Sequence, residues 1–392
     1  MQCTPRFALG MLLVIATPSL PSAQTCVKEA TKCITAPNGG DCASIGLWNG
    51  RSKTCSLTQD LTGEAIQIDG DGITLDGRGR TLTGGSLGEL QQLFAVLAAQ
   101  RRDITVANLT IRGFQTGIGL VECSHCTVKG STLRDSSRAG IELSDSNDSR
   151  VAENQVSGTG DGIVVNQSTG NLIEKNTVES NRNSGILLNN DASRNVLKGN
   201  VTRLNSGGIT MGGNSDYNTL TGNEIVGNTH MGLAVYFFSN ENVVLDNRIT
   251  SNAAGVENGA GILVMQSSGN RFTNNTVSGN SRGIWLSYPD GEPYDGGGNE
   301  VYNNNFLGNR TQAMVTGRRS TADAFSKQAP IGGNFWDNWK SPDAAGDGIL
   351  DSAYQFGGSG DEFPWAAQDG WAPRPTAPAP PDIVQSSPGK HP

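Results

Sequence analysis

Three consecutive stretches share one pattern: NTVESNRNSGILL at 176–188, NVTRLNSGGITM at 200–211 and NEIVGNTHMGLAV at 223–235. Each begins with an asparagine, has a second asparagine five residues later, and continues to a glycine followed by alternating apolar residues. A period near 23 residues is shorter than most helical repeats. It suits a solenoid in which each turn, or rung, contains three short strands.

The two asparagine positions can be followed outward from this core in both directions. The first recurs at Leu109, Ser131, Asn154, Asn176, Asn200, Asn223, Asn247, Asn275 and Asn304. The second recurs at Phe114, Ser136, Thr159, Asn181, Asn205, Asn228, Asn252, Asn280 and Asn309. Stacked asparagines can hydrogen-bond from rung to rung, and asparagine tolerates the left-handed backbone of tight turns. We therefore expect these positions to form turns that stack in register.

Apolar residues alternate after a glycine in each rung. The pairs expected to point inward are Ile118/Leu120, Ile141/Leu143, Ile163/Val165, Ile186/Leu188, Ile209/Met211, Leu233/Val235, Ile262/Val264 and Ile284/Leu286. Successive side chains of a strand point to opposite faces, so the residues between them face outward. The sequence predicts an all-β fold, a right-handed parallel β-helix of roughly eleven rungs.

Composition agrees with a solenoid. The 392 residues include 52 glycines, with only 17% charged and 6% aromatic residues. A large compact core would need more bulky apolar groups, whereas each rung fills only a thin slice of interior. The net charge of −8 argues against a nucleic-acid-binding protein.

The N-terminus is typical of a secretory signal peptide. Arg6 precedes an apolar run at 7–16, and small residues at 22–23 offer a cleavage point before Gln24. The run is too short to span a membrane permanently, and no other segment reaches that length. We expect a monomeric, secreted or periplasmic protein without a membrane span.

The remaining boundaries follow from cysteine content and repeats. We expect a signal peptide at 1–23, a Cys-rich N-terminal cap at 24–56, the β-helix at 57–317, a Trp-rich C-terminal cap at 318–371 and a disordered Pro-rich tail at 372–392. The cysteines left after export are Cys26, Cys33, Cys42, Cys55, Cys123 and Cys126. An even number in an exported chain predicts disulfides, and proximity favours the pairs 26–33, 42–55 and 123–126.

Several segments resemble known families. The repeated rungs resemble the β-helix repeats of carbohydrate-binding and sugar-hydrolysing proteins. GGNFW at 332–336, GDGILD at 346–351 and DEFP at 361–364 resemble the C-terminal part of NosD-like periplasmic β-helix proteins. The resemblance spans about residues 57–365. It implies the fold and leaves the reaction open, since related solenoids differ in function. The chain has neither the Asp-Pro-His motif of mannuronan epimerases nor the Arg-x-Pro-x-x-Arg motif of pectate lyases.

Two rungs are longer than the others, with extra residues at 253–260 and 288–298. Loops at these points would rise on opposite edges of one sheet and enclose a groove. Aromatic faces stack on sugar rings, so the outward residues of this region are candidate substrate-binding residues. They are Tyr236, Met265, Trp285 and Tyr288. The alternative is that the long loops simply bury these side chains.

Polar residues beside the groove suggest two reactions. In a uronan lyase, His230 or Tyr236 could remove the proton next to the substrate carboxylate while Arg282 neutralises that carboxylate. In a glycosidase, Glu257 and Asp290 could be the two facing carboxylates. The simpler interpretation of each is an exposed turn residue without a catalytic role.

Metal sites are a further possibility. Asp343, Asp347 and Asp351 fall at steps of four near two glycines, a composition that suits Ca²⁺. Copper would need His, Met or thiolate ligands. Candidates exist at His125 and His230, but Cys123 and Cys126 are expected to form a disulfide.

The leading hypothesis is an exported protein that binds a polysaccharide, with cleavage or epimerisation as the reactions open to it. The alternative is a non-catalytic NosD-like periplasmic, copper-associated maturation factor or a surface interaction protein.

Overall fold

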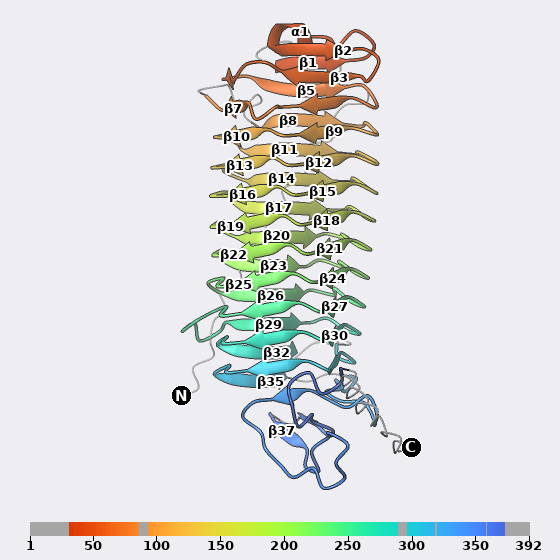
Figure 1. The fold of residues 1–392 in the computed structure, drawn as a ribbon, viewed down its shortest axis with the longest axis vertical. Helices are drawn as coiled ribbons and strands as arrows, with labels where there is room; N and C mark the ends of the chain where they lie inside the picture. The colour runs from red at the N-terminus through yellow and green to blue at the C-terminus, as the bar shows by residue number, and fades with distance from the viewer. Residues whose placement is uncertain (1–30, 86–92, 289–295, 318–319, 358, 373–392) are drawn as a thin grey trace, which may run out of the picture.

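The structure is a computed structural model that describes residues 31–85, 93–288, 296–317, 320–357 and 359–372. The chain winds into a long right-handed parallel β-helix, with its strands stacked rung upon rung (Figure 1). Within the described residues, three sheets of twelve strands each run along the solenoid, one more than the number of rungs expected. The predicted fold class is confirmed.

Each complete rung contributes one strand to each sheet, in the order A, B, C, and one antiparallel pair belongs to sheet B at the N-terminal end. Sheet A contains β1 (Thr31–Thr35), β5 (Ala65–Asp69), β8 (Phe94–Ala99), β11 (Thr116–Val121), β14 (Ala139–Ser144), β17 (Asp161–Asn166), β20 (Ser184–Asn189), β23 (Gly207–Met211), β26 (Met231–Tyr236), β29 (Ala260–Met265), β32 (Arg282–Tyr288) and β35 (Thr311–Gly317). Sheet B contains β2 (Gly46–Asn49), β3 (Thr54–Leu57), β6 (Thr74–Asp76), β9 (Thr105–Ala107), β12 (Thr127–Lys129), β15 (Arg150–Ala152), β18 (Leu172–Glu174), β21 (Val196–Lys198), β24 (Thr219–Thr221), β27 (Val243–Leu245), β30 (Arg271–Thr273) and β33 (Glu300–Tyr302). Sheet C contains β4 (Leu61–Thr62), β7 (Thr81–Thr83), β10 (Thr110–Arg112), β13 (Thr132–Arg134), β16 (Gln155–Ser157), β19 (Thr177–Glu179), β22 (Val201–Arg203), β25 (Glu224–Val226), β28 (Arg248–Thr250), β31 (Thr276–Ser278), β34 (Asn305–Leu307) and β36 (Phe335–Trp336). We call the connections between them the A–B, B–C and C–A turns.

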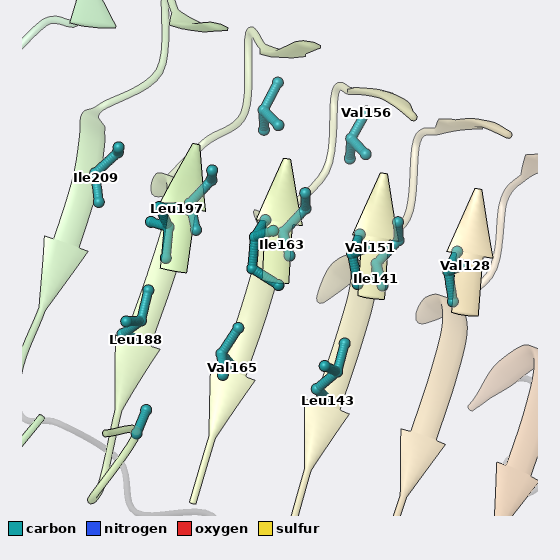
Figure 2. Close-up of a cluster of buried hydrophobic side chains, with 14 of the residues drawn as sticks. Val128, Ile141, Leu143, Val151, Val156, Ile163, Val165, Leu188, Leu197 and Ile209 are labelled. Carbon is teal, nitrogen blue, oxygen red and sulfur yellow. The ribbon is translucent and has the colours of Figure 1, made fainter. Parts of the chain in front are cut away.

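The interior is a column of aliphatic side chains. Ile141 stacks on Ile163 and Ile163 on Ile186 in parallel register, and all three are fully buried. Figure 2 shows Ile141 of sheet A beside Val151 of sheet B within this column. The alternation read from the sequence therefore placed the core correctly in every predicted pair.

Both asparagine positions form hydrogen-bonded ladders. In the B–C turns, the Asn176 side-chain amide donates to the Asn200 Oδ1 at 3.0 Å, and Asn200 donates to Asn223 at 3.0 Å. In the C–A turns, Asn181 donates to Asn205 at 2.9 Å. Each buried amide also donates to a backbone carbonyl or accepts a backbone N–H, so these polar side chains are satisfied inside the solenoid.

A third ladder occupies the A–B turns and was not predicted. It runs through Ser149, Asn171, Asn195, Asn218, Asn242, Asn270 and Asn299. From Asn171 onward its members lie five residues before those of the first ladder, so the same spacing rule would have found them. Three ladders, one per turn, hold the rungs in register.

Two expected disulfides are present. Cys42, which begins the short helix α1 (Cys42–Ile45), bonds to Cys55, and Cys123 bonds to Cys126. Cys33 is also disulfide-bonded, while its expected partner Cys26 lies outside the described residues. The Cys42–Cys55 bond joins α1 to β3.

Aromatic side chains close the C-terminal end, as expected. Trp336 is buried and stacks on Phe306 of β34 with ring centroids 4.4 Å apart. The hairpin of β37 (Tyr354–Phe356) and β38 (Ser359–Asp361) packs over it, with Tyr354 at 4.8 Å. No helix among the described residues is both long and apolar enough to cross a membrane.

Candidate functional site

The outward face of sheet A carries an apolar strip near its C-terminal end. Parallel register places Trp285 directly opposite Leu263 on one side and Met314 on the other. One column further along the strands, Tyr236 lies opposite Met265. Tyr236, Met265, Trp285 and Met314 are all partly exposed, so three of the four predicted binding residues do line one surface.

Arg282 lies over the Trp285 indole. Its guanidinium carbon is 4.7 Å from the ring centroid, a cation–π geometry, and the indole Nε1 donates to Thr316 Oγ1 at 2.9 Å. One guanidinium nitrogen also donates to the carbonyls of Glu257 and Gly259, the latter at 3.3 Å. These contacts fix Arg282 at the edge of sheet A where the C–A turns end.

A cleft opens beside Arg282 where the C-terminal cap meets sheet A. It encloses about 530 Å³, and its walls include Arg282, Arg310, Gln312, Met314, Tyr354 and Phe356. A smaller hollow of about 180 Å³ adjoins it and is lined by both arginines together with Glu257, Ser281 and Thr311. Glu257 and Arg282 therefore line the same hollow.

Several surface arginines elsewhere in the described structure form ion pairs. Arg203 pairs with Glu179 and Arg248 with Glu224. Within the described residues, neither Arg282 nor Arg310 has a carboxylate within ion-pair distance. In a chain with a net charge of −8, the cleft thus concentrates two positive charges that lack a described counter-ion.

Tyr288 is not a surface residue, contrary to prediction. Its side chain is buried, and its hydroxyl donates to Asp323 Oδ1 at 2.8 Å and accepts from Asn299 Nδ2 at 2.9 Å. The cause is the strand alternation itself: β32 continues to Tyr288, so this residue points inward like Ile284 and Leu286.

His230 and Tyr236, the bases expected for a lyase, do not line the cleft. His230 is exposed in a C–A turn two rungs from Arg282, with Nδ1 3.2 Å from Ser206 Oγ and 3.0 Å from Thr229 Oγ1. Burial raises the pKa of Tyr236 to about 12, so its phenol stays protonated at neutral pH and is not suited to act as a base. Asp290 lies outside the described residues.

The proposed calcium ligands do not form a metal site. Asp343 accepts the backbone N–H groups of Gly346 and Gly348 at 2.7 and 2.9 Å, and Asp351 accepts that of Ala344 at 3.0 Å. Asp347 likewise accepts a backbone N–H within its own turn. Among the described residues, no group of three or more His, Cys, Asp or Glu side chains is placed to hold a metal. These aspartates shape turns of the C-terminal cap.

Copper ligands are not assembled either. Cys123 and Cys126 are oxidised to a disulfide, which removes both thiolates that flank His125. His125 follows a sheet A strand, whereas His230 precedes one several rungs away. Met211 is buried inside the solenoid. The donors that copper prefers are thus dispersed over the described structure.

Sequence reasoning missed other residues of the cleft, among them Arg310, Met314, Tyr354 and Phe356. The first two occupy positions of the repeat equivalent to Ser281 and Trp285, so the rung alignment could have found them. The last two come from the cap, and only its fold over sheet A brings them to the cleft.

Comparisons with known proteins agree with the fold. Residues 94–249 match the family model described as right handed beta helix region, and residues 191–341 match that of a periplasmic copper-binding protein (NosD). No curated protein sequence matches the chain. The periplasmic alginate epimerase AlgG is a similar solved structure, with 17% identity, 69% of this chain and 74% of that chain covered, and a TM-score of 0.53. The A-module of the Azotobacter vinelandii mannuronan C-5 epimerase AlgE4 has 15% identity, 74% and 88% coverage, and a TM-score of 0.50. At these identities the likeness concerns the fold.

Proposed function

We propose that this right-handed parallel β-helix protein binds an anionic polysaccharide on the outward face of sheet A. The observation that carries the proposal is the pair Arg282 and Arg310, which share one cleft and have no carboxylate partner among the described residues. A guanidinium binds a carboxylate through two parallel hydrogen bonds, so a sugar acid is the ligand class that the pair fits.

Trp285 and Met314 supply the apolar part of this surface. The indole is partly exposed beside Arg282, and Met314 continues the same outward column into the cleft. A pyranose ring presents an apolar C–H face and a polar edge, which suits a floor of this kind bordered by arginines. Alginate, a uronan, is the substrate named for the solved structures of similar fold and is the first ligand to test.

We propose Glu257 as the residue on which any turnover depends. Lyase cleavage and C5 epimerisation both begin when a base removes the proton next to the uronate carboxylate. Arg282 would neutralise that carboxylate, and Glu257 is the ionisable acid in the same small hollow. The proton would pass to the Glu257 carboxylate, leaving a carbanion that the guanidinium stabilises.

The test is titration calorimetry of the purified full chain with oligouronides, beside neutral glycans of equal length. We expect Arg282→Ala and Arg310→Ala each to weaken uronide binding roughly tenfold or more. Arg134→Ala is the matched control, because Arg134 is an exposed arginine of sheet C and should leave affinity unchanged. Equal binding of neutral glycans, or unchanged affinity in both cleft variants, would refute the proposal.

Turnover is measured in a separate assay of the reaction products. Unsaturated products indicate a lyase, released reducing ends without them indicate a hydrolase, and a changed ratio of C5 epimers indicates an epimerase. We expect Glu257→Gln to abolish whichever signal occurs while oligouronide affinity is retained. Binding without any turnover would identify a non-catalytic binding protein.

We also propose that the chain is exported. The Cys42–Cys55 and Cys123–Cys126 disulfides are typical of an oxidising compartment, and the sequence begins with a signal-like segment. Mass spectrometry of the protein recovered from the periplasm or medium should find a mature N-terminus near Gln24. Retention of an uncleaved, reduced chain in the cytoplasm would contradict export.

A further inference from the structure

An aromatic patch lies at the opposite edge of sheet A from the arginine cleft. Phe237 and Phe238 occupy the A–B turn after β26, and Tyr217 occupies the corresponding turn of the preceding rung. Their side chains are 36%, 43% and 54% exposed, among the most exposed large apolar groups in the described structure. The turns are stacked, since Asn214 N donates to Phe237 O at 3.1 Å.

The backbone of this turn is unfavourable for phenylalanine. Phe237 and Phe238 have φ values of 48° and 63°, in the left-handed region that bulky residues rarely adopt. The two preceding rungs have the same pair of left-handed residues at this place, filled by Asn190-Asp191 and by Gly213-Asn214. Asparagine, aspartate and glycine are the ordinary residues of such turns. Two consecutive phenylalanines thus replace residues that would fold here with less strain, and both remain exposed at the surface.

The patch is continuous with the cleft across sheet A. The Phe237 ring lies 5.9 Å from that of Tyr236, and Tyr236 is opposite Met265, which is opposite Ser287 of β32. From Tyr236 to Arg282 the path covers five residues along a strand and two rungs across, about 20 Å. A chain molecule that is bound at the arginines and extended over the sheet would reach the phenylalanines.

Charged groups of both signs surround the patch and can contact a sugar ligand. Asp191 and Asp216 lie beside it in the A–B turns, and Asp216 Oδ1 accepts the Asn240 backbone N–H at 2.6 Å. Arg194 lies over the Tyr217 ring at 5.4 Å. Sugar hydroxyls can hydrogen-bond to these aspartates and uronate carboxylates to Arg194, while the rings stack on C–H faces.

We propose that Phe237 and Phe238, with Tyr217, form a distal subsite that stacks on pyranose rings of the same polysaccharide chain whose carboxylates bind at Arg282 and Arg310. This inference rests on the proposed function and extends it. The ligand is then an oligosaccharide long enough to cross sheet A, held by charge at one edge and by stacking at the other.

The experiment compares short and long oligouronides on the full chain. The Phe237→Gly/Phe238→Asn double variant copies the Gly213-Asn214 turn of the preceding rung, so it should fold at least as stably as the parent protein, as thermal unfolding will show. We expect affinity to rise with length in the parent protein, and the double variant to lose roughly tenfold in affinity for the long oligomers only. Its salt dependence should match the parent's, because the arginines are intact.

Leu204→Asn is the matched control. Leu204 is 60% exposed with a φ of 57°, but it lies in a C–A turn away from the patch, so this variant should bind every oligomer normally. If long oligomers bind the parent no more tightly than short ones, or if the double variant binds both like the parent, the distal subsite is refuted while the proposed function stands. If no oligouronide binds the parent at any length, both proposals fail.

Discussion

Asn334 donates its backbone N–H to Asp361 Oδ2 at 2.6 Å, and its side-chain amide is 3.4 Å from the same oxygen. This contact ends the B–C ladder, in which each amide donates toward the C-terminal end of the solenoid. The other ladders end similarly: Asn299 donates to Asp323, and Asn309 donates to Gln312, whose amide donates to Asp337. A row of aligned amides leaves N–H groups at its last rung, and a carboxylate accepts them without adding a donor of its own.

Protonation of Asp361 should make stability depend on pH. Burial raises the pKa of Asp361 to about 6 from an ordinary 3.8, although the N–H groups of Asn334, Trp336 and Phe363 act in the opposite direction. A raised pKa means that the folded state binds the proton more tightly than the unfolded state. The contribution of protonated Asp361 to the stability of the folded state is therefore full below pH 4. It is lost as the pH rises through about 6. The difference corresponds to about 3 kcal/mol.

Urea unfolding of the parent protein and of Asp361→Asn at several pH values between 4 and 8 measures this contribution. We expect the difference in unfolding free energy between the two proteins to change across this range, because only the parent titrates at this site. A difference that stays constant from pH 4 to 8 would show that Asp361 does not titrate there.

A single ladder asparagine should matter greatly to stability. Asn223 accepts the Asn200 backbone N–H at 2.9 Å and donates to Leu197 O and Asn247 Oδ1, both at 2.9 Å. Asn223→Ala leaves these buried groups without partners, so we expect a loss of roughly 3–5 kcal/mol. Chemical denaturation measures it, with Asn183→Ala in an exposed turn as the control. Equal stability of the two variants would contradict the role given to the ladder.

Tyr288→Phe should affect folding and leave binding unchanged. The substitution removes the hydroxyl that donates to Asp323 and accepts from Asn299, with an expected cost of about 2 kcal/mol. Tyr236→Phe is the control, since its hydroxyl makes no hydrogen bond to a described residue, and we expect a change within about 0.5 kcal/mol. Weaker oligouronide binding by well-folded Tyr288→Phe would place Tyr288 back among the ligand-binding residues.

Arg282→Lys separates charge from geometry at the cleft. Lysine keeps the positive charge but lacks the planar fork that binds a carboxylate through two hydrogen bonds. We expect oligouronide affinity to fall roughly tenfold while its dependence on salt remains that of the parent. Calorimetry at two salt concentrations tests this. Arg282→Ala, by comparison, should reduce the salt dependence as well.

The fold followed from the sequence because every rung repeats the same local chemistry. Asparagine at a turn and alternation in a strand act within a few residues, so spacing alone placed Ile141, Asn200 and their equivalents. The same rule, applied further, would have placed Asn218 in a ladder and Tyr288 in the core. The cleft depends instead on the C-terminal cap, where Tyr354 approaches Arg310 only through the long-range packing of a hairpin on β35. No local pattern encodes that contact.

Because all rungs share one register, the length of the solenoid can change without any change to its two caps. Removal of residues 176–199 would join Lys175 to Asn200 and leave Asn154 facing Asn200, Thr159 facing Asn205 and Asn171 facing Asn218. Each junction repeats one that the solenoid already contains. The protein would shorten by one strand spacing, about 4.8 Å, with both caps intact. Evolution could thus add or delete whole rungs and change the span of the solenoid without redesigning either end.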